Sequence, residues 1–253
     1  TLVDTYANIL DAAANQNGML SLSDTDYGYL GLTSVGADEA SLLNTALPGK
    51  SASDLATWSD LEALADTAAR VMEIAAGNTP SPALSASELS ASGLGITGVN
   101  DANLPGVLAA ISSSDVASVN TLPGLQSVAD AAITAFDNVL TKVQTYAGDG
   151  SNAIGTGSSI PAQSDYERLS VDFSNYTTAA ADLIGSVNTV LASAPVEGDN
   201  GSAPADVSTA AKVKALFSHY DAIRSAAASN GNLSLNASDY QAMGLPIVGA
   251  EGA

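Results

Sequence analysis

The chain has 253 residues, and 27 acidic against seven basic residues give it a formal net charge of −20 at pH 7. This charge makes nucleic acid and anionic membranes poor partners, and the absence of cysteine excludes disulfides and thiolate chemistry. No apolar run reaches about 18 residues, so we expect no membrane insertion. Aromatic residues are 5% of the chain. We expect the single tryptophan, Trp58, and the eight tyrosines to serve packing, not recognition.

The first 50 residues are predicted to form a long, a short and a medium helix. The long helix carries apolar residues at spacings of three and four, which places them on one face; they are Val3, Tyr6, Leu10 and Ala13. The short helix begins at Ser23, where Asp26 completes a capping-box pattern, and ends at Gly31. The medium helix begins near Ala37 and ends before Pro48.

The same order of helices is predicted along the rest of the chain. Apolar stripes of helical period mark long helices at 61–75, 125–143, 176–190 and 213–227. Ser85 and Glu88 form a second capping-box pattern, and a medium helix is expected at 104–111. The third unit has longer Gly/Ser-rich loops, at 148–159 and 197–204.

One stretch of sequence occurs more than once. The segment LSLSDTDYGYLGLTSV at 20–35 returns at 84–99 and 233–248, and more weakly around 166. One column of this alignment holds Leu30, Leu94, Leu169 and Met243, and the next holds Gly31, Gly95, Ser170 and Gly244. Self-similarity of this kind is the signature of a repeat architecture.

These patterns predict an all-α fold made of tandem three-helix repeats (long, short and medium helix) in an elongated array. The predicted units are residues 1–52, 53–121, 122–205 and a partial unit at 206–253. We expect the chain to be a segment of a longer tandem array, because both ends fall inside repeat units.

The sequence carries no set of catalytic residues that points to an enzyme. Gly93, Gly95 and Gly98 match the dinucleotide-binding pattern GxGxxG, but that pattern requires a preceding strand, and a short helix is predicted there instead. We therefore interpret these glycines as a helix stop. His219 is the only histidine, and no GxSxG, HExxH or P-loop pattern occurs.

Calcium is the one cofactor that the acidic composition suggests. The segment from Ala13 to Asp24 resembles an EF-hand loop, but position one, which needs an oxygen ligand, is Ala13. A calcium site made of carboxylates where repeats meet is a separate hypothesis, with Asp149, Asp199 and Asp24 as weak candidates. The alternative is that the acids serve solubility alone.

The pattern LSxSDYxxLGLTxV, with the small-residue helices NDANLPGVLAAI and LEALADTAARVMEIAAG, resembles the helical tandem repeats of very large bacterial surface proteins. These include biofilm-associated and RTX-type adhesins. The likeness is strongest over residues 2–111 and 213–248, and the calcium-binding nonapeptides of RTX proteins are absent. The resemblance implies an extracellular location on a bacterial cell surface and a structural or adhesive role. It transfers no binding residue.

Together these observations favour a non-enzymatic spacer segment of an extracellular adhesin, whose partners are the neighbouring repeats of its own chain. A subunit of a self-assembling surface coat or filament, with homotypic contacts between chains, is an alternative. A helical module that binds a host protein is a third hypothesis.

Overall fold

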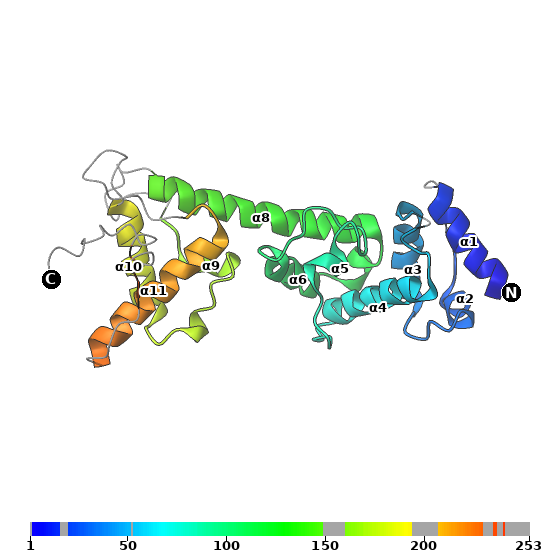
Figure 1. The fold of residues 1–253 in the computed structure, drawn as a ribbon, viewed down its shortest axis with the longest axis horizontal. Coiled ribbons are helices and arrows are strands. Elements are labelled where there is room, and N and C mark those ends of the chain that lie inside the picture. The colour runs from blue at the N-terminus through cyan, green and yellow to red at the C-terminus, as the bar shows by residue number, and fades with distance from the viewer. Residues whose placement is uncertain are drawn as a thin grey trace. The chain divides into compact units, whose positions relative to one another are not determined.

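A computed structural model describes residues 2–15, 20–51, 53–148, 160–193, 207–229, 235–236 and 240, and every regular element in these ranges is helical (Figure 1). This confirms the predicted all-α class. The chain divides into two compact units, Thr1–Thr134 and Ala135–Ala253, which we call the first and the second unit. The Gly/Ser-rich loops at 149–159 and 197–204 lie outside the described residues, as do Met243 and Gly244.

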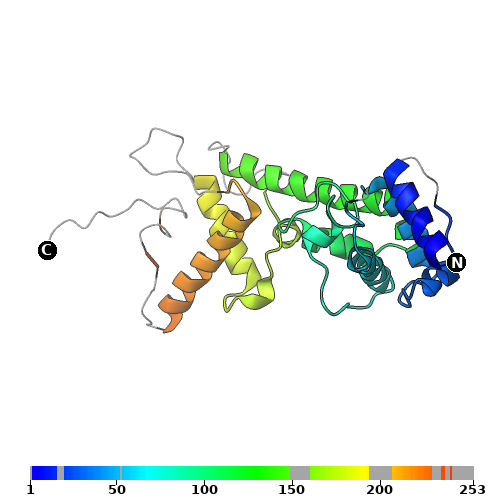
Figure 2. The ribbon, with the colours of Figure 1, turned by 45° about the vertical axis from the view of Figure 1, so that its right-hand side comes forward.

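The first unit contains seven α-helices and the beginning of an eighth within its described residues. They are α1 (Leu2–Asn15), α2 (Asp24–Tyr29), α3 (Ala37–Ala46), α4 (Trp58–Ala75), α5 (Ala86–Leu89), α6 (Leu104–Ser112), α7 (Val116–Val119) and α8 (Leu122–Gly148), with a 3₁₀ turn, η1 (Leu47–Gly49), after α3. Figures 1 and 2 show α1 and α2 towards the N-terminal end of this unit, where α1 packs against η1 and α2 packs against α3. The helix α2 has six residues, whereas α1 has 14 and α3 has 10, so the short helix between two longer ones was predicted correctly.

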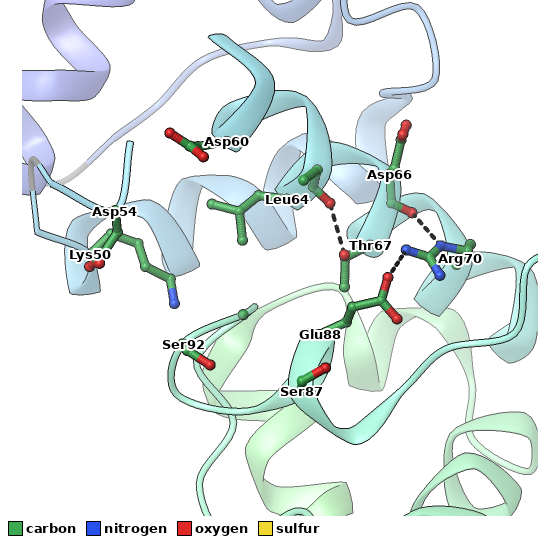
Figure 3. Close-up of a pocket in the computed structure, with 12 residues that line it drawn as sticks. Lys50, Asp54, Asp60, Leu64, Asp66, Thr67, Arg70, Ser87, Glu88 and Ser92 are labelled. Carbon is green, nitrogen blue, oxygen red and sulfur yellow. Dashed lines mark hydrogen bonds and ion pairs between the residues drawn. The ribbon is translucent and has the colours of Figure 1, made fainter. Parts of the chain in front are cut away.

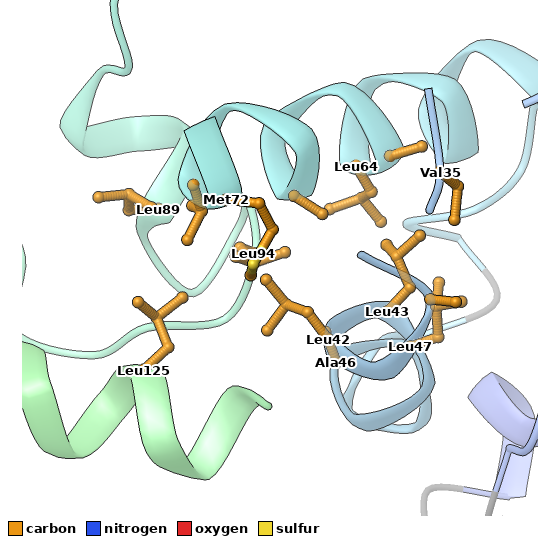
Figure 4. Close-up of a cluster of buried hydrophobic side chains, with 14 of the residues drawn as sticks. Val35, Leu42, Leu43, Ala46, Leu47, Leu64, Met72, Leu89, Leu94 and Leu125 are labelled. Carbon is orange, nitrogen blue, oxygen red and sulfur yellow. The ribbon is translucent and has the colours of Figure 1, made fainter. Parts of the chain in front are cut away.

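The core of the first unit lies between α3, α4 and the turn after α5 (Figure 4). Its fully buried side chains include Leu42 and Leu43 of α3, Leu61 of α4, and Leu94. The helix α4 buries one face because its apolar residues recur at helical spacing. Thr57 caps its N-terminus, since the Thr57 hydroxyl accepts a hydrogen bond from the backbone N–H of Asp60 at 3.3 Å. Burying each leucine stabilises the fold by about 1.5–3 kcal/mol.

The second unit packs the second half of α8 against α9 (Gln163–Arg168), α10 (Ala180–Ser193) and α11 (Ala210–Ser229), with a 3₁₀ turn, η2 (Phe173–Asn175), before α10. Its centre is aromatic. The rings of Tyr166 and Phe217 meet edge to face at 4.6 Å between centroids, and Phe173 approaches Phe217 at 5.3 Å. Such pairs are stabilising beyond the area they bury.

One predicted helix begins later than expected. The stripe at 176–190 predicted a helix from Tyr176, but α10 begins at Ala180. Asp221, on α11, accepts hydrogen bonds from the backbone N–H groups of Thr177 at 3.2 Å and Thr178 at 2.7 Å. The residues before α10 are thus held by a carboxylate from a helix distant in sequence, which a local pattern does not reveal.

The helix α8 contributes to both cores. Leu125 and Ala129 are buried in the first unit, while Val139 and Val143 are buried in the second. The boundary between the two compact units falls inside this helix, after Thr134. The division into four repeats stays a prediction.

Candidate functional site

The short helices α2, α5 and α9 begin in the same way. In each, a carboxylate in the first turn accepts a hydrogen bond from the backbone N–H three residues earlier, which satisfies a donor that the helix leaves unpaired. The pairs are Ser23 with Asp26 at 2.8 Å, Ser85 with Glu88 at 2.8 Å and Ala162 with Asp165 at 2.7 Å. The two capping boxes predicted from sequence are confirmed, and the third uses an alanine.

The chain also leaves each short helix through a turn with one residue in the left-handed region. Gly31, Gly95 and Ser170 have φ values of 89°, 115° and 65°, in the left-handed region that favours glycine. The next residue then donates its N–H back to the helix in all three: Leu32 to the Tyr27 carbonyl at 3.1 Å, Ile96 to the Leu89 carbonyl at 2.8 Å and Val171 to the Tyr166 carbonyl at 3.1 Å. Ser170 departs from the glycine column in sequence but keeps its conformation.

The turn after α5 contains two extra residues. Leu89 and Ile96 are seven positions apart (96 − 89), whereas Tyr27 and Leu32 are five apart (32 − 27). Gly93 lies in this insertion, and a Cβ at its position would meet the Glu88 carbonyl oxygen at 2.0 Å. The GxGxxG match is therefore explained by close backbone packing after a short helix, as predicted.

The repeated leucine column is buried where the structure describes it. Leu30, Leu94 and Leu169 are 4%, 0% and 1% exposed. Each leucine immediately precedes the left-handed turn residue, so the turn directs its side chain into the core.

In two of the short helices the capping carboxylate also pairs with a base on the preceding long helix. Arg70 of α4 approaches Glu88 at 2.6 Å, and Lys142 of α8 approaches Asp165 at 2.7 Å. The hydrogen bond from Arg70, with further ones from Ser85, lowers the pKa of Glu88 to about 2. These ion pairs were missed because the partners are far apart in sequence; α1 carries no base at all.

A side-chain amide holds the segment before α2. Asn44 donates to the Leu22 carbonyl at 2.8 Å and accepts from the Leu22 N–H at 3.1 Å. In the second unit, Asn188 donates to the carbonyl of Pro161 at 2.9 Å. Pro161 has no N–H, so this contact keeps one of the two backbone bonds.

The first unit has an open cleft of about 390 Å³ beside α4 and α5 (Figure 3). Lys50 lines it, is 3% exposed and donates a hydrogen bond to the Ala91 carbonyl at 3.0 Å; burial lowers the pKa of Lys50. The four acidic lining residues, which are Asp54, Asp60, Asp66 and Glu88, outnumber Lys50 and Arg70, so the cleft disfavours an anion. Its hydroxyl groups are those of Thr67, Ser87 and Ser92, and its lining contains no histidine.

Of the calcium candidates, only Asp24 lies in the described part of the chain; Asp149 and Asp199 lie outside it. Asp24 lines a cavity of about 380 Å³ between the start of α2 and α3. Its Oδ1 accepts a hydrogen bond from the Thr25 N–H at 2.7 Å, a role in the helix start. The described residues contain no group of three or more His, Asp or Glu side chains suited to a metal ion. Calcium binding stays a prediction.

The prediction that the aromatic residues serve packing is confirmed for the buried tyrosines and stays a prediction for the exposed ones. Tyr27, Tyr146 and Tyr166 are fully buried, but Tyr29 is 70% and Trp58 is 38% exposed. His219 lies on α11.

Comparison of the chain with models of protein families, with curated proteins and with solved structures finds no match. Among the described helices, none combines the length and apolar composition needed to cross a membrane.

Proposed function

We propose that the chain is a non-enzymatic spacer segment of an extracellular bacterial surface adhesin, built from tandem three-helix repeats. Each repeat consists of a long, a short and a medium helix, and contacts mainly its neighbours along the chain. Such an array holds a distant binding domain away from the cell and requires no chemistry of its own.

The observation that carries the proposal is the recurrence of one backbone arrangement at three places. The short helices α2, α5 and α9 share the capping carboxylate, the left-handed exit turn and the buried leucine that precedes it. These features serve folding, and they support a role in which the scaffold itself is the function.

Electron microscopy of negatively stained protein separates the spacer from a self-assembling coat. The spacer predicts separate particles at micromolar protein, both with calcium and with a chelator. Ordered sheets or fibres in either condition would favour the coat or filament instead. Calcium binding at repeat junctions would in addition raise the melting temperature, by mass action.

Location is tested on the cells that make the protein. Antibodies raised against the purified chain should label intact cells without permeabilisation. Labelling that appears only after the cells are permeabilised would contradict a surface adhesin.

A further inference from the structure

The large exposed apolar side chains of the described residues all lie in the first unit. Val3, Tyr29 and Trp58 are 72%, 70% and 38% exposed. The ring of Trp58 lies 6.4 Å from that of Tyr6, and its Cζ2 lies 3.9 Å from the position of a Cβ at Gly31, two residues after Tyr29. Val3 lies one helical turn before Tyr6 on α1. We call these five residues the aromatic surface: Val3, Tyr6, Tyr29, Gly31 and Trp58.

Hydrogen bonds fix the Tyr6 side chain and the backbone next to Trp58. The Tyr6 hydroxyl donates a hydrogen bond to the Leu55 carbonyl at 3.1 Å. Trp58 is the first residue of α4, directly after Thr57, whose N–H donates to the Asp60 carboxylate at 2.8 Å. Rigid aromatic side chains offer a large contact area at low entropic cost, which is the property that binding surfaces exploit.

The part of the chain that carries most of the aromatic surface is acidic in sequence. Residues 1–49 contain six acids and no base, and the first base, Lys50, is 3% exposed. Glu62 is exposed and lies one turn after Trp58 on α4. Any partner of this surface therefore meets aromatic faces in a negative field, and both features attract a cation.

We propose that the aromatic surface binds an arginine-rich segment of another protein. A guanidinium group stacks on aromatic faces and pairs with carboxylates through two parallel hydrogen bonds, so it matches both features at once. A second copy of this chain would bring a further charge of −20 against the same field. The quaternary ammonium of a zwitterionic lipid would stack on the rings, but its phosphate would be repelled. This binding function is separate from the spacer role and does not depend on it.

The tryptophan fluorescence of the chain comes from this surface, because Trp58 is its only tryptophan. The probe is a short peptide of alternating arginine and glycine, titrated into the full chain at physiological salt. We expect a saturable change in Trp58 emission. The same peptide with citrulline, a neutral isostere of arginine, should cause none, and a lysine peptide should bind more weakly, because it loses the paired hydrogen bonds.

Two variants test which residues carry the binding. Tyr29→Ser removes an exposed ring and should weaken binding about two- to fivefold, the range expected for one exposed cation–π contact. Glu62→Gln should also weaken it. Glu73→Gln is the matched control, since Glu73 is exposed on the same helix and lies about 16 Å further along. That distance exceeds the screening length of about 8 Å, so the control should bind like the unmodified chain. Circular dichroism and melting curves confirm that each variant is folded.

Three results would overturn the proposal. Equal binding of the arginine peptide by Tyr29→Ser and the unmodified chain would show that Tyr29, the most exposed ring, takes no part, and the surface as defined would be wrong. A change in Trp58 emission with phosphatidylcholine vesicles, in the absence of any with the arginine peptide, would assign the surface to lipid. Concentration-dependent dimerisation that shifts Trp58 emission and is lost in Tyr29→Ser would assign it to a second copy of the chain.

Discussion

The phenol of Tyr27 donates a hydrogen bond of 3.1 Å to the side-chain oxygen of Asn44. Tyr27 is fully buried, so its hydroxyl needs a partner inside the fold. Asn44 is also the residue that binds both backbone groups of Leu22. One amide thus joins the segment before α2, the ring within α2 and the helix α3. Tyr166 donates in the same way to Asn188 in the second unit.

Removing the Asn44 side-chain amide should lower the free energy of unfolding more than removing the Tyr27 hydroxyl. Tyr27→Phe loses one hydrogen bond and should lower the free energy of unfolding by about 1 kcal/mol. Asn44→Ala also leaves the Tyr27 hydroxyl buried without an acceptor and should cost about 2–3 kcal/mol. Urea denaturation followed by circular dichroism measures both. Equal losses in the two variants would show that the contacts with Leu22 contribute nothing.

The repeated leucine is predicted to be essential to the core. Leu94→Ala should lower the free energy of unfolding by about 2–5 kcal/mol, because Leu94 is fully buried. Ser92→Ala is the control two residues away; Ser92 is exposed, and its change should stay within about 0.5 kcal/mol. If Leu94→Ala behaved like this control, the column would not be part of the core.

Ser170 tests the turn after α9, where a substitution by glycine should increase stability. It holds a φ of 65° without being glycine, a conformation that costs a side-chain-bearing residue about 1–2 kcal/mol. Ser170→Gly should therefore raise stability by up to about 1 kcal/mol, after the greater freedom of glycine in the unfolded chain is subtracted. Gly31→Ser should lower stability by a similar amount. The equivalence of the two turns would be refuted by a destabilised Ser170→Gly variant.

Low pH should lower the stability of the first unit, because it protonates Glu88. Its pKa is lowered from 4.5 to about 2, chiefly by the hydrogen bond from Arg70. A carboxylate with a depressed pKa in the folded state stabilises the fold above its unfolded pKa. That contribution is therefore complete above about pH 4.5 and disappears as the pH falls towards 2. Glu88→Gln should flatten the pH dependence of the melting temperature in this window, whereas Glu73→Gln should follow the unmodified chain. Parallel curves for Glu88→Gln and the unmodified chain would refute the role of Glu88.

The local features of the fold could be predicted because they are written in neighbouring residues. Ser23 and Asp26 lie within one turn of each other, and a glycine at position 31 signals a helix end without knowledge of the rest of the chain. The left-handed conformation of Ser170 was not predictable, because serine rarely adopts it and tertiary packing imposes it.

The contacts between elements could not be predicted in the same way. Arg70 and Glu88 are 18 residues apart, and Asn44 and Leu22 are 22 apart, so no local pattern joins them. The two-residue insertion between Leu89 and Leu94 was hidden because a gapless alignment keeps the leucine and glycine columns in register. The exposure of Tyr29 depends on which helices cover α2, so its place in the aromatic surface was also missed.

Small-angle scattering tests the proposed repeat array most directly. A compact chain of this length has a radius of gyration of about 18 Å. Among the described helices, all except α8, which has 27 residues, have at most 20, so we take each repeat as roughly 30 Å long at 1.5 Å per residue. Three such units and a partial one laid end to end reach about 100 Å, with a radius of gyration near 30 Å. The account predicts a value near 30 Å for monomeric protein. A value near 18 Å would mean that the chain folds into one globule, and it would contradict a spacer made of repeats.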